Sequence, residues 1–498
     1  MGIHFDGGTT YIYVSPNGNG TGLSESSPAY FKDVFAKLSQ SHSLGTIVVK
    51  CLPGTYDFED NYTYRIKGNV SIRAFDDENK PIFTRTALSA DYLFGAYSND
   101  ILSFHNIVFD KWSAGRGDAD TDIPACAKAY GRGEVMVLNC EIRATKFSGA
   151  INGVSCFTAI NKGSQVTILA NIYTSDPTIL FNAPDSIAPG STANRFSILY
   201  GYNGGIITGF TAATAKIEIK AGALGRALTV FKGLAKTEVS ATTFHVTFDS
   251  CYRLIESSYH TKGINMFLTQ RGYNTDGTVD NTAVGGTDFK VYDTLLALKY
   301  SARCRIVFTL YSDIFCENHF ILAEKCSGYV ILTSNNSNTR NINSTASGNS
   351  SSSNAAINVK NAACMFEINP SVVINNTSGL QFNDGIQVSN SMGNTVVLSS
   401  VSGSNVTIGG RGSAVRLNTK ANVYLRTVTL TDAGNGLYLA PSGNECLIID
   451  SSVTNNTTGI NVTNGSRVTT QNVTLSGNTN NYNSGANVSA ATAEVKTI

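Results

Sequence analysis

Four acidic residues in the middle of the chain carry the side chains that cleavage of a glycosidic bond requires. Asp249 and Glu256 flank a tyrosine–arginine pair, and Asp313 and Glu317 form a second group a short distance further on. Enzymes of this kind use two carboxyl groups about 5 to 9.5 Å apart, one of them as an acid. The alternative interpretation is that each acid belongs to a turn or a strand edge, and the wide dispersal of acids in this region favours it. We therefore keep the four as catalytic candidates and expect that the chain is not an enzyme.

Tyrosines beside these acids suggest a carbohydrate surface. Tyr252, Tyr259 and Tyr273 lie in the same stretch of polar sequence. A tyrosine ring offers an apolar face that stacks on a sugar ring, together with a hydroxyl group that forms hydrogen bonds. Packing in a core or between subunits explains such aromatic residues equally well. We take these three as the candidate carbohydrate-binding residues.

The sequence predicts neither a metal site nor a cofactor. Asp118, Asp120 and Asp122 alternate in a glycine-containing stretch and have the oxygen ligands that calcium prefers, but the distal glutamate of an EF-hand loop is missing. A solvated turn is the favoured interpretation of this stretch. The 10 cysteines include no Cys-x-x-Cys pair and lie mostly in apolar runs, so we expect buried thiols, with zinc ligands or disulfides as the alternative.

A recurring short phrase in the C-terminal part predicts the scaffold that would position these residues. Two apolar residues separated by one other residue recur at 386–388, 415–417, 437–439 and 460–462. The spacing of about 20 to 30 residues is typical of solenoids, and the alternation within each phrase is typical of strands. Turn residues rich in Asn and Gly separate the phrases, as a parallel β-helix requires.

A second phrase runs in step with the first and extends the same prediction. Because each repeat stacks on its neighbours, equivalent apolar residues should form interior columns about 4.8 Å apart. We expect Val415, Leu437 and Ile460 in one column, and Val406, Val428, Val453 and Val473 in another.

The N-terminal part predicts one helix among strands. Ser27 and Pro28 have the residue types of a helix N-cap and first turn, and Phe31, Val34, Phe35 and Leu38 follow with the spacing of one apolar stripe. A buried strand is expected at 46–52. A helix at this position can cover the apolar end and unpaired strand edges of the first coil, so we expect it to be a cap.

These N-terminal motifs resemble a known superfamily. Tyr-Val-Ser-Pro-Asn-Gly-Asn-Gly at 13–20, the helix, and Ile-Val-Val-x-x-x-Pro-Gly-Thr-Tyr at 47–56 resemble the start of pectate-lyase-like right-handed β-helix proteins, which include many bacteriophage tailspike and tail-fibre proteins. The resemblance covers about residues 11–110, and the coils after about 385 look similar. It implies an all-β fold: a right-handed, single-stranded parallel β-helix with a short N-terminal capping helix. The acidic calcium cluster and arginine base of pectate lyases are missing, so that activity is not implied.

We expect four segments along the chain. Residues 1–45 hold the N-terminal strand and the capping helix, and 46–125 the first coils. Residues 126–355 form coils with long inserts, and 356–498 form regular C-terminal coils. The β-helix is expected to begin near the N-terminus and to run almost to Ile498, with no separate virion-anchoring or trimerisation domain.

Composition excludes several classes of partner. Lys and Arg number 37 and Asp and Glu 36, so the net charge of +1 predicts no nucleic-acid partner. No apolar run is long enough to span a membrane, and no secretory signal is recognisable. We expect assembly in a host cytoplasm and a final location in the virion.

The resemblance implies a virion structural protein: a tailspike- or tail-fibre-like subunit that contacts the host surface. Homotrimerisation, contacts with other virion proteins and binding to a host surface glycan are implied in the same way. One alternative is a polysaccharide depolymerase, either glycoside hydrolase or lyase, on the same β-helix. Others are a subunit that decorates a capsid or baseplate and a cellular adhesion protein.

Overall fold

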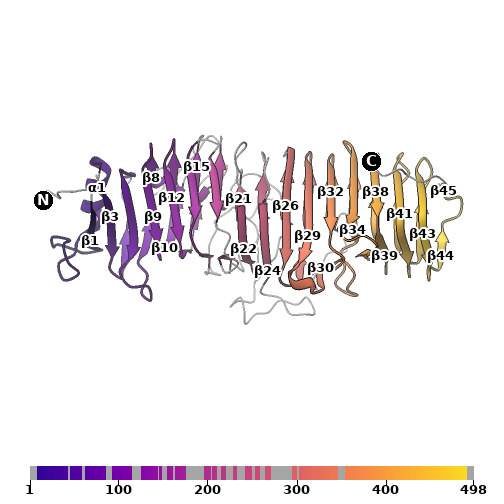
Figure 1. Cartoon of the computed structure of the whole chain (residues 1–498), viewed down its shortest axis with the longest axis horizontal. Coiled ribbons are helices and arrows are strands. Elements are labelled where there is room, and N and C mark those ends of the chain that lie inside the picture. Colours follow the sequence, from indigo (N-terminus) through magenta and orange to yellow (C-terminus); the bar gives the residue numbers. More distant parts are fainter. Residues whose placement is uncertain are drawn as a thin grey trace. The chain divides into compact units, whose positions relative to one another are not determined.

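The computed structural model describes eighteen segments of the chain and consists almost entirely of parallel β-strands (Figure 1). The chain forms two compact units. Unit 1 lies mainly within Met1–Tyr252 and unit 2 mainly within Val291–Ile498, and short segments of residues 253–290 are divided between the two units. The described residues are 8–42, 45–58, 62–85, 92–114, 125–143, 145–147, 154–160, 163–174, 196–202, 205–209, 215–219, 228–232, 242–248, 253–257, 264–270, 294–299, 302–345 and 354–490.

Unit 1 contains three parallel sheets that the chain visits in a fixed order. From β5 to β20 each strand of sheet I is followed by one strand of sheet II and then by one or, for β13 and β14, two strands of sheet III. Sheet I comprises β5 (Tyr64–Ile66), β8 (Tyr92–Tyr97), β11 (Ala125–Tyr130), β15 (Val154–Ile160), β18 (Phe196–Tyr202) and β21 (Leu228–Lys232). Sheet II comprises β2 (Ala29–Tyr30), β1 (Thr9–Ser15), β3 (Thr46–Cys51), β6 (Asn69–Ala74), β9 (Ile101–His105), β12 (Glu134–Leu138), β16 (Gln165–Ile168) and β19 (Ile206–Gly209). Sheet III comprises β4 (Thr55–Asp57), β7 (Ile82–Arg85), β10 (Val108–Ala114), β13 (Cys140–Ile142), β14 (Thr145–Phe147), β17 (Ile172–Thr174), β20 (Lys216–Ile219) and β22 (Thr242–Phe248).

Unit 2 alternates between two parallel sheets. Sheet IV comprises β23 (Arg253–Ser257), β25 (Thr294–Lys299), β28 (His319–Glu324), β31 (Ala355–Lys360), β34 (Asp384–Ser389), β37 (Ser413–Leu417), β40 (Asn435–Leu439), β42 (Thr458–Val462) and β44 (Asn480–Tyr482). Sheet V comprises β24 (Ile264–Gln270), β26 (Ala302–Leu310), β27 (Ile314–Cys316), β29 (Ser327–Ser334), β30 (Arg340–Ser344), β32 (Ala363–Ile368), β33 (Val372–Ile374), β35 (Asn394–Ser399), β36 (Val406–Ile408), β38 (Asn422–Arg426), β39 (Val428–Thr431), β41 (Glu445–Thr454), β43 (Arg467–Ser476) and β45 (Val488–Ala490). A 3-10 turn, η2, spans Asn335–Ser337. Stacked parallel strands visited in a repeating order are consistent with a β-solenoid.

The first interior column has the predicted register. Val415 pairs with Leu437 and Leu437 with Ile460, and none of the three is exposed. The column also includes Ile386, the partner of Val415. Because a residue and its partner on the next parallel strand point to the same side of the sheet, the apolar spacing in the sequence is sufficient to identify this column.

The second predicted column is wrong at one position. Val406 pairs with Val428 as expected, but the next coil presents Ser451 in that column, and Ser451 pairs with Val473. Val453 instead pairs with Leu430, two residues further along. Ser451 is buried, and its hydroxyl oxygen accepts a hydrogen bond from the Val428 N–H at 3.2 Å. A polar residue therefore occupies a position in the column for which the sequence pattern predicted an apolar residue.

The helix forms but begins later than expected. Helix α1 spans Phe31–Gln40, because the backbone of Ala29–Tyr30 pairs with β1 as strand β2. Ser27 is not the N-cap; its hydroxyl accepts a hydrogen bond from the Thr21 N–H at 3.1 Å. The predicted stripe of Phe31, Val34, Phe35 and Leu38 is buried.

The corners between strands use left-handed backbone, as the turn composition predicted. Asp432, Asn455 and Gly477, which lie in turns between the apolar phrases, have φ values of 51°, 57° and 66°. Asparagine and aspartate tolerate this conformation better than most residues because their short side chains form local hydrogen bonds.

The cysteine prediction also holds: among the described residues, eight cysteines are buried free thiols.

Within the described segments, no helix is both long enough and apolar enough to cross a membrane.

Candidate functional site

The first predicted acid pair lies mainly outside the described residues. Asp249 is not described, and of Glu256 only the backbone is, in strand β23, where it pairs with Ala297 of β25. Both stay predictions.

The second pair lies at a corner of unit 2. Asp313 directly precedes β27, and its carboxylate accepts hydrogen bonds from Asn341 N at 2.9 Å and Asn341 Nδ2 at 3.2 Å. Glu317 directly follows β27, and its main-chain oxygen accepts a hydrogen bond from Asn354 Nδ2 at 2.6 Å. Both oxygens of Asp313 therefore hold the start of the neighbouring strand β30. This structural role is sufficient to explain Asp313, and a catalytic role for the pair stays a prediction.

The other predicted ligand-binding residues are also outside the described segments. They are Tyr252, Tyr259 and Tyr273 for carbohydrate, and Asp118, Asp120 and Asp122 in the acidic stretch. Among the residues that are described, no group of three or more His, Cys, Asp or Glu side chains is arranged to hold a metal ion.

Sheet I of unit 1 carries a cluster that sequence reasoning missed. We call it the aromatic–cation patch: Arg65 on β5, Tyr92 and Tyr97 on β8, and Lys128 and Tyr130 on β11. The strands are in register, so that Arg65 pairs with Gly95 and Gly95 with Lys128, while Tyr97 pairs with Tyr130. Three adjacent strands therefore bring two cations and three tyrosine rings to one part of the sheet.

The tyrosine rings of the patch hold one another in place. Tyr97 and Tyr130 are stacked, with ring centroids 5.2 Å apart and an interplanar angle of 29°. The hydroxyl group of Tyr97 donates a hydrogen bond to the Tyr92 hydroxyl at 2.8 Å. A side chain at Gly95 would lie 2.7 Å from the Tyr92 ring, so glycine is needed for the rings to close over this strand. Aromatic pairs of this kind contribute about 0.5–1.5 kcal/mol beyond their buried area.

Cations complete the patch. The Arg65 guanidinium carbon lies 4.3 Å from the centroid of the Tyr97 ring, and Lys128 Nζ lies 5.5 Å from that of Tyr92. Burial, followed by the hydrogen bond with Tyr92, raises the pKa of Tyr97 well above its ordinary value, so its hydroxyl stays protonated. Tyr130 is 36% exposed and Arg65 is also exposed. Lys128 is buried, so the patch offers aromatic surface, hydroxyl groups and the Arg65 guanidinium in a geometry that packing has already ordered.

A second candidate is an open hollow in unit 2 of about 650 Å³. Its polar side chains include Arg426 and Asp450, whose Nε and Oδ2 atoms are 3.7 Å apart, and Asn472, whose Nδ2 donates to Asp450 Oδ1 at 2.9 Å. Ser399 lines the hollow too, but its hydroxyl donates to main-chain oxygens of its own loop. Among the described residues lining the hollow, Asp450 is the one acid. One carboxylate meets half of the requirement for glycosidic cleavage, while the mixed donors and acceptors suit sugar hydroxyls.

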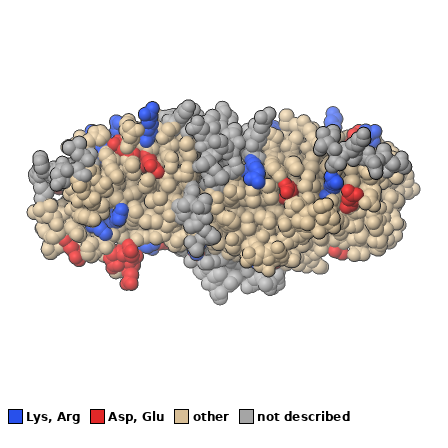
Figure 2. All heavy atoms as spheres, viewed as in Figure 1, with Lys and Arg blue, Asp and Glu red and all other residues tan. Residues whose placement is uncertain are grey.

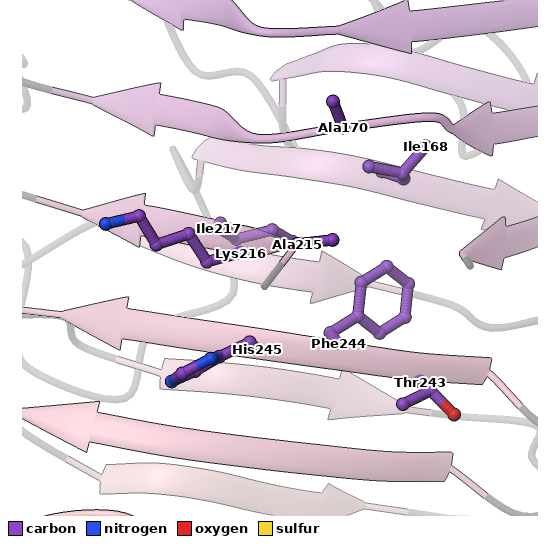
Figure 3. Close-up of a pocket in the computed structure, with 8 residues that line it drawn as sticks. All are labelled: Ile168, Ala170, Ala215, Lys216, Ile217, Thr243, Phe244 and His245. Atoms are coloured by element: carbon purple, nitrogen blue, oxygen red, sulfur yellow. The ribbon is translucent and has the colours of Figure 1, made fainter. Parts of the chain in front are cut away.

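A third space, between β16, β20 and β22 of unit 1, is too small for a ligand (Figure 3). Its volume of about 10 Å³ admits at most one water molecule. Lys216 and His245 are register partners and point the same way on adjacent strands, away from Ile168 and Phe244. Lys216 Nζ contacts Glu218 Oε2 at 2.8 Å, a pairing that lets Glu218 stay buried.

Charged residues make up only 15% of the chain, so local clusters of them are informative. Figure 2 shows a face covered largely by uncharged residues with scattered charges of both signs.

The sequence signal for the aromatic–cation patch consists of three tyrosines. Tyr92 and Tyr97 stand at the two ends of strand β8, and Tyr130 stands at the end of the next strand of sheet I. This sequence signal is weak because the number of residues between these strands differs from coil to coil. The pairing of Tyr97 with Tyr130 is therefore apparent only from the structure.

A scan against models of known protein families finds no match for this chain, and no curated protein matches its sequence.

Proposed function

We propose that this protein is a right-handed parallel β-helix, capped by α1, that acts as a glycan-binding structural subunit of a phage tail appendage. The repeating sheet order in unit 1 and the in-register columns of unit 2 support the β-helix. Support for the cap comes from Phe35, whose ring lies 5.2 Å from that of Phe94 on β8 and 5.8 Å from that of Tyr64 on β5.

The aromatic–cation patch carries the proposal that the ligand is a glycan. Sugar rings have apolar faces and polar edges, so a site for them combines aromatic surface with hydrogen-bonding groups. Tyr130 supplies an exposed ring, and Arg65 supplies donors beside the Tyr97 ring. Parallel strands fix both residues, and rigid elements hold binding geometry better than loops do.

A binding role is favoured over a depolymerase by the state of the described acids. Asp313 is engaged by Asn341, and Asp450 is the one acid among the described residues that line the hollow in unit 2. Assembly into homotrimers, contact with other virion proteins and location in the virion belong to the same proposal, and they rest on the resemblance of the N-terminal motifs to tailspike proteins.

Binding to a panel of bacterial surface polysaccharides tests the glycan proposal. We expect Tyr130→Ala and Tyr97→Ala to weaken binding about tenfold or more, since each removes a ring of the patch. Tyr482→Ala is the matched control, because Tyr482 is 43% exposed and lies in unit 2. Equal binding by all variants, with the fold intact, would contradict the proposal.

Two further measurements test the alternatives. Release of reducing ends from the same polysaccharides, abolished by Glu256→Gln or Glu317→Gln, would establish a depolymerase in place of a pure binding protein. Sedimentation of the purified chain would test trimerisation, and a monomer at micromolar concentration would contradict it.

A further inference from the structure

Sheet II of unit 1 carries three basic side chains in one row. Lys50 on β3 pairs with Arg73 on β6, and Arg73 pairs with His105 on β9. Partners on adjacent parallel strands point to the same side, so the three side chains span about 10 Å. We call Lys50, Arg73 and His105 the basic strip. Tyr13 on β1 is the register partner of Lys50 and extends the row by an aromatic ring.

The strip has no acidic counterpart within the described segments. Arg73 Nε donates to Ser71 Oγ at 2.7 Å, which orients the guanidinium group and leaves its remaining donors for another partner. Three acids follow β6 in the next turn; no ion pair among the described residues joins Glu78 to the strip, and amide groups engage the other two. Asp76 accepts hydrogen bonds from Asn79 and from the Glu78 N–H, and Asp77 accepts one from Asn106.

Such an arrangement is unfavourable without a ligand. Like charges opposite each other on neighbouring strands destabilise a sheet, and this row places the charged Lys50 opposite the charged Arg73. The burial of His105, then Arg73 and then Lys50, lowers the pKa of His105 to about 4. The residue facing His105 from β12 is Leu138, which supplies no compensating charge. A bound anion would relieve this repulsion.

We propose that the basic strip binds the anionic groups of an acidic polysaccharide. A carboxylate, phosphate or sulfate accepts the charge-assisted hydrogen bonds that Arg73 and Lys50 can donate. A polysaccharide fits better than nucleic acid, because the strip offers three basic groups over a short row while the chain has a net charge of only +1. This inference builds on the proposed function by naming the charge class of the glycan, and it uses residues outside the aromatic–cation patch.

Three forms of one polymer test the proposal with the full chain. Dextran, carboxymethyl dextran and dextran sulfate share a backbone and differ in charge, so they separate carboxylate from sulfate binding and both from neutral binding. We expect the two anionic forms to bind at least tenfold more tightly than dextran. We also expect affinity to fall as salt is raised from about 0.05 to 0.3 M, because salt screens partly exposed charges. Equal binding of all three polymers would overturn the proposal.

Variants locate the site. Arg73→Gln and Lys50→Gln should each weaken binding of dextran sulfate about tenfold. Lys37→Gln removes the same charge from the exposed face of α1 and should change affinity less than twofold. Thermal unfolding of each variant checks that the fold is intact. Wild-type affinity in both strip variants, or an equal loss in Lys37→Gln, would refute the site.

The pH dependence of binding provides a readout that a purely structural role of His105 would not produce. A bound sulfate stabilises protonated His105, so its pKa rises in the complex, and affinity should increase about tenfold as pH falls from 7 to 5. His105→Gln should abolish this pH dependence, and an unchanged pH profile in that variant would count against the strip. Tighter binding of a short DNA duplex than of dextran sulfate would also overturn the proposal. Loss of these effects, with binding through Tyr130 retained, would leave the proposed glycan function standing.

Discussion

The N-terminal end of unit 1 and the C-terminal coils of unit 2 pack their interiors in different ways. Both units bury phenylalanine rings completely, for example Phe83 in unit 1 and Phe308 and Phe366 in unit 2. Around α1 in unit 1, the rings of Phe35, Phe58, Phe83 and Phe94 contact one another. The interior columns of unit 2 consist mainly of Val, Leu and Ile, as in Ile386, Val415, Leu437 and Ile460. The N-terminal end of unit 1 therefore packs as a cluster of contacting rings, and the column through Leu437 in unit 2 packs as a stack of aliphatic side chains.

Unit 2 adds ladders of hydrogen bonds at its corners. Asn456 Oδ1 accepts from the Ala433 N–H at 3.1 Å, and Asn478 Oδ1 accepts from the Asn456 N–H at 2.9 Å. A second ladder links Ala421 to Asn444 and Asn444 to Ser466 in the same way. Each side chain satisfies a corner N–H of the preceding coil, which sheet pairing leaves without a partner.

This difference shows two solutions to one packing problem. Coils of nearly constant length place equivalent corners above one another, so short polar side chains can reach from coil to coil. At the N-terminal end of unit 1, contacting aromatic rings fill the interior. The outer faces of unit 1 place unlike residues side by side, as in the aromatic–cation patch and the basic strip.

Truncating an aromatic ring in unit 1 should have the largest effect. Phe35 is fully buried and contacts the rings of Phe58, Tyr64, Phe83 and Phe94. We expect Phe35→Ala to lower the free energy of unfolding by about 3–5 kcal/mol. Denaturant unfolding measures this loss of stability, and hydrogen exchange in β5 and β8 shows whether it is local to this end of unit 1. Lys37→Ala, on the exposed face of α1, is the control. A loss below about 1 kcal/mol would mean that α1 does not stabilise this end of unit 1.

A buried acid should make the stability of unit 2 depend on pH. Asp384 is fully buried, its Oδ1 has no hydrogen-bond partner, and burial raises its pKa from 3.8 to about 7 against the opposing effect of Arg416. Because the folded pKa is raised, the stabilisation from protonated Asp384 is complete below about pH 3.8 and is lost as the pH rises to 7.

Asp384→Asn mimics the protonated acid and should remove this loss. Relative to wild type, the variant should gain about 1.4 kcal/mol per pH unit between pH 4 and 7. Urea unfolding at several pH values measures the difference. Asp450→Asn, at a 41% exposed side chain, is the control. A difference between Asp384→Asn and wild type that does not change with pH would contradict the prediction.

Removing one ladder residue should have an intermediate effect in unit 2. Asn456 is buried, and its Nδ2 donates to Leu430 O at 3.0 Å and to Thr454 O at 2.9 Å while its Oδ1 accepts from Ala433. Asn456→Ala leaves these groups unsatisfied and should cost about 2–3 kcal/mol. Hydrogen exchange at Ala433 should accelerate. Asn394→Ala, an exposed position in β35, should change stability by less than about 0.5 kcal/mol. Equal effects in the two variants would show that the ladders do not stabilise unit 2.

Restoring the expected apolar column should have the smallest effect, and it should be unfavourable. Ser451→Val places an aliphatic residue between Val428 and Val473 but removes the acceptor of the Val428 N–H. We expect a loss of about 1–2 kcal/mol in denaturant unfolding, with little change in Thr474→Val at an exposed position of β43. A stabilised Ser451→Val protein would mean that apolar packing outweighs the ladder at this corner.

The fold was more predictable than the candidate sites. The apolar phrases predicted stacked parallel strands and the column through Leu437, because burial repeats with the coil and leaves a period in the sequence. The same phrases misplaced Val453, because a buried serine that is satisfied by a neighbouring N–H is indistinguishable in sequence from an exposed one. The sequence identified Asp313 as a candidate because of its carboxyl group, but only the structure shows that this carboxylate accepts hydrogen bonds from Asn341.

The sequence by itself determined strand periodicity, the apolar stripe of α1 and the left-handed corners, since each depends on residues close together in the chain. Only the tertiary structure decided which outer residues face each other. Tyr97 meets Tyr130, and Lys50 meets Arg73 and His105, through the register of strands from different coils. The connections between those strands differ in length, and a shift of one residue turns a side chain to the opposite face of the sheet. Surface chemistry on a stacked sheet therefore depends on register, which no local pattern in this chain specifies.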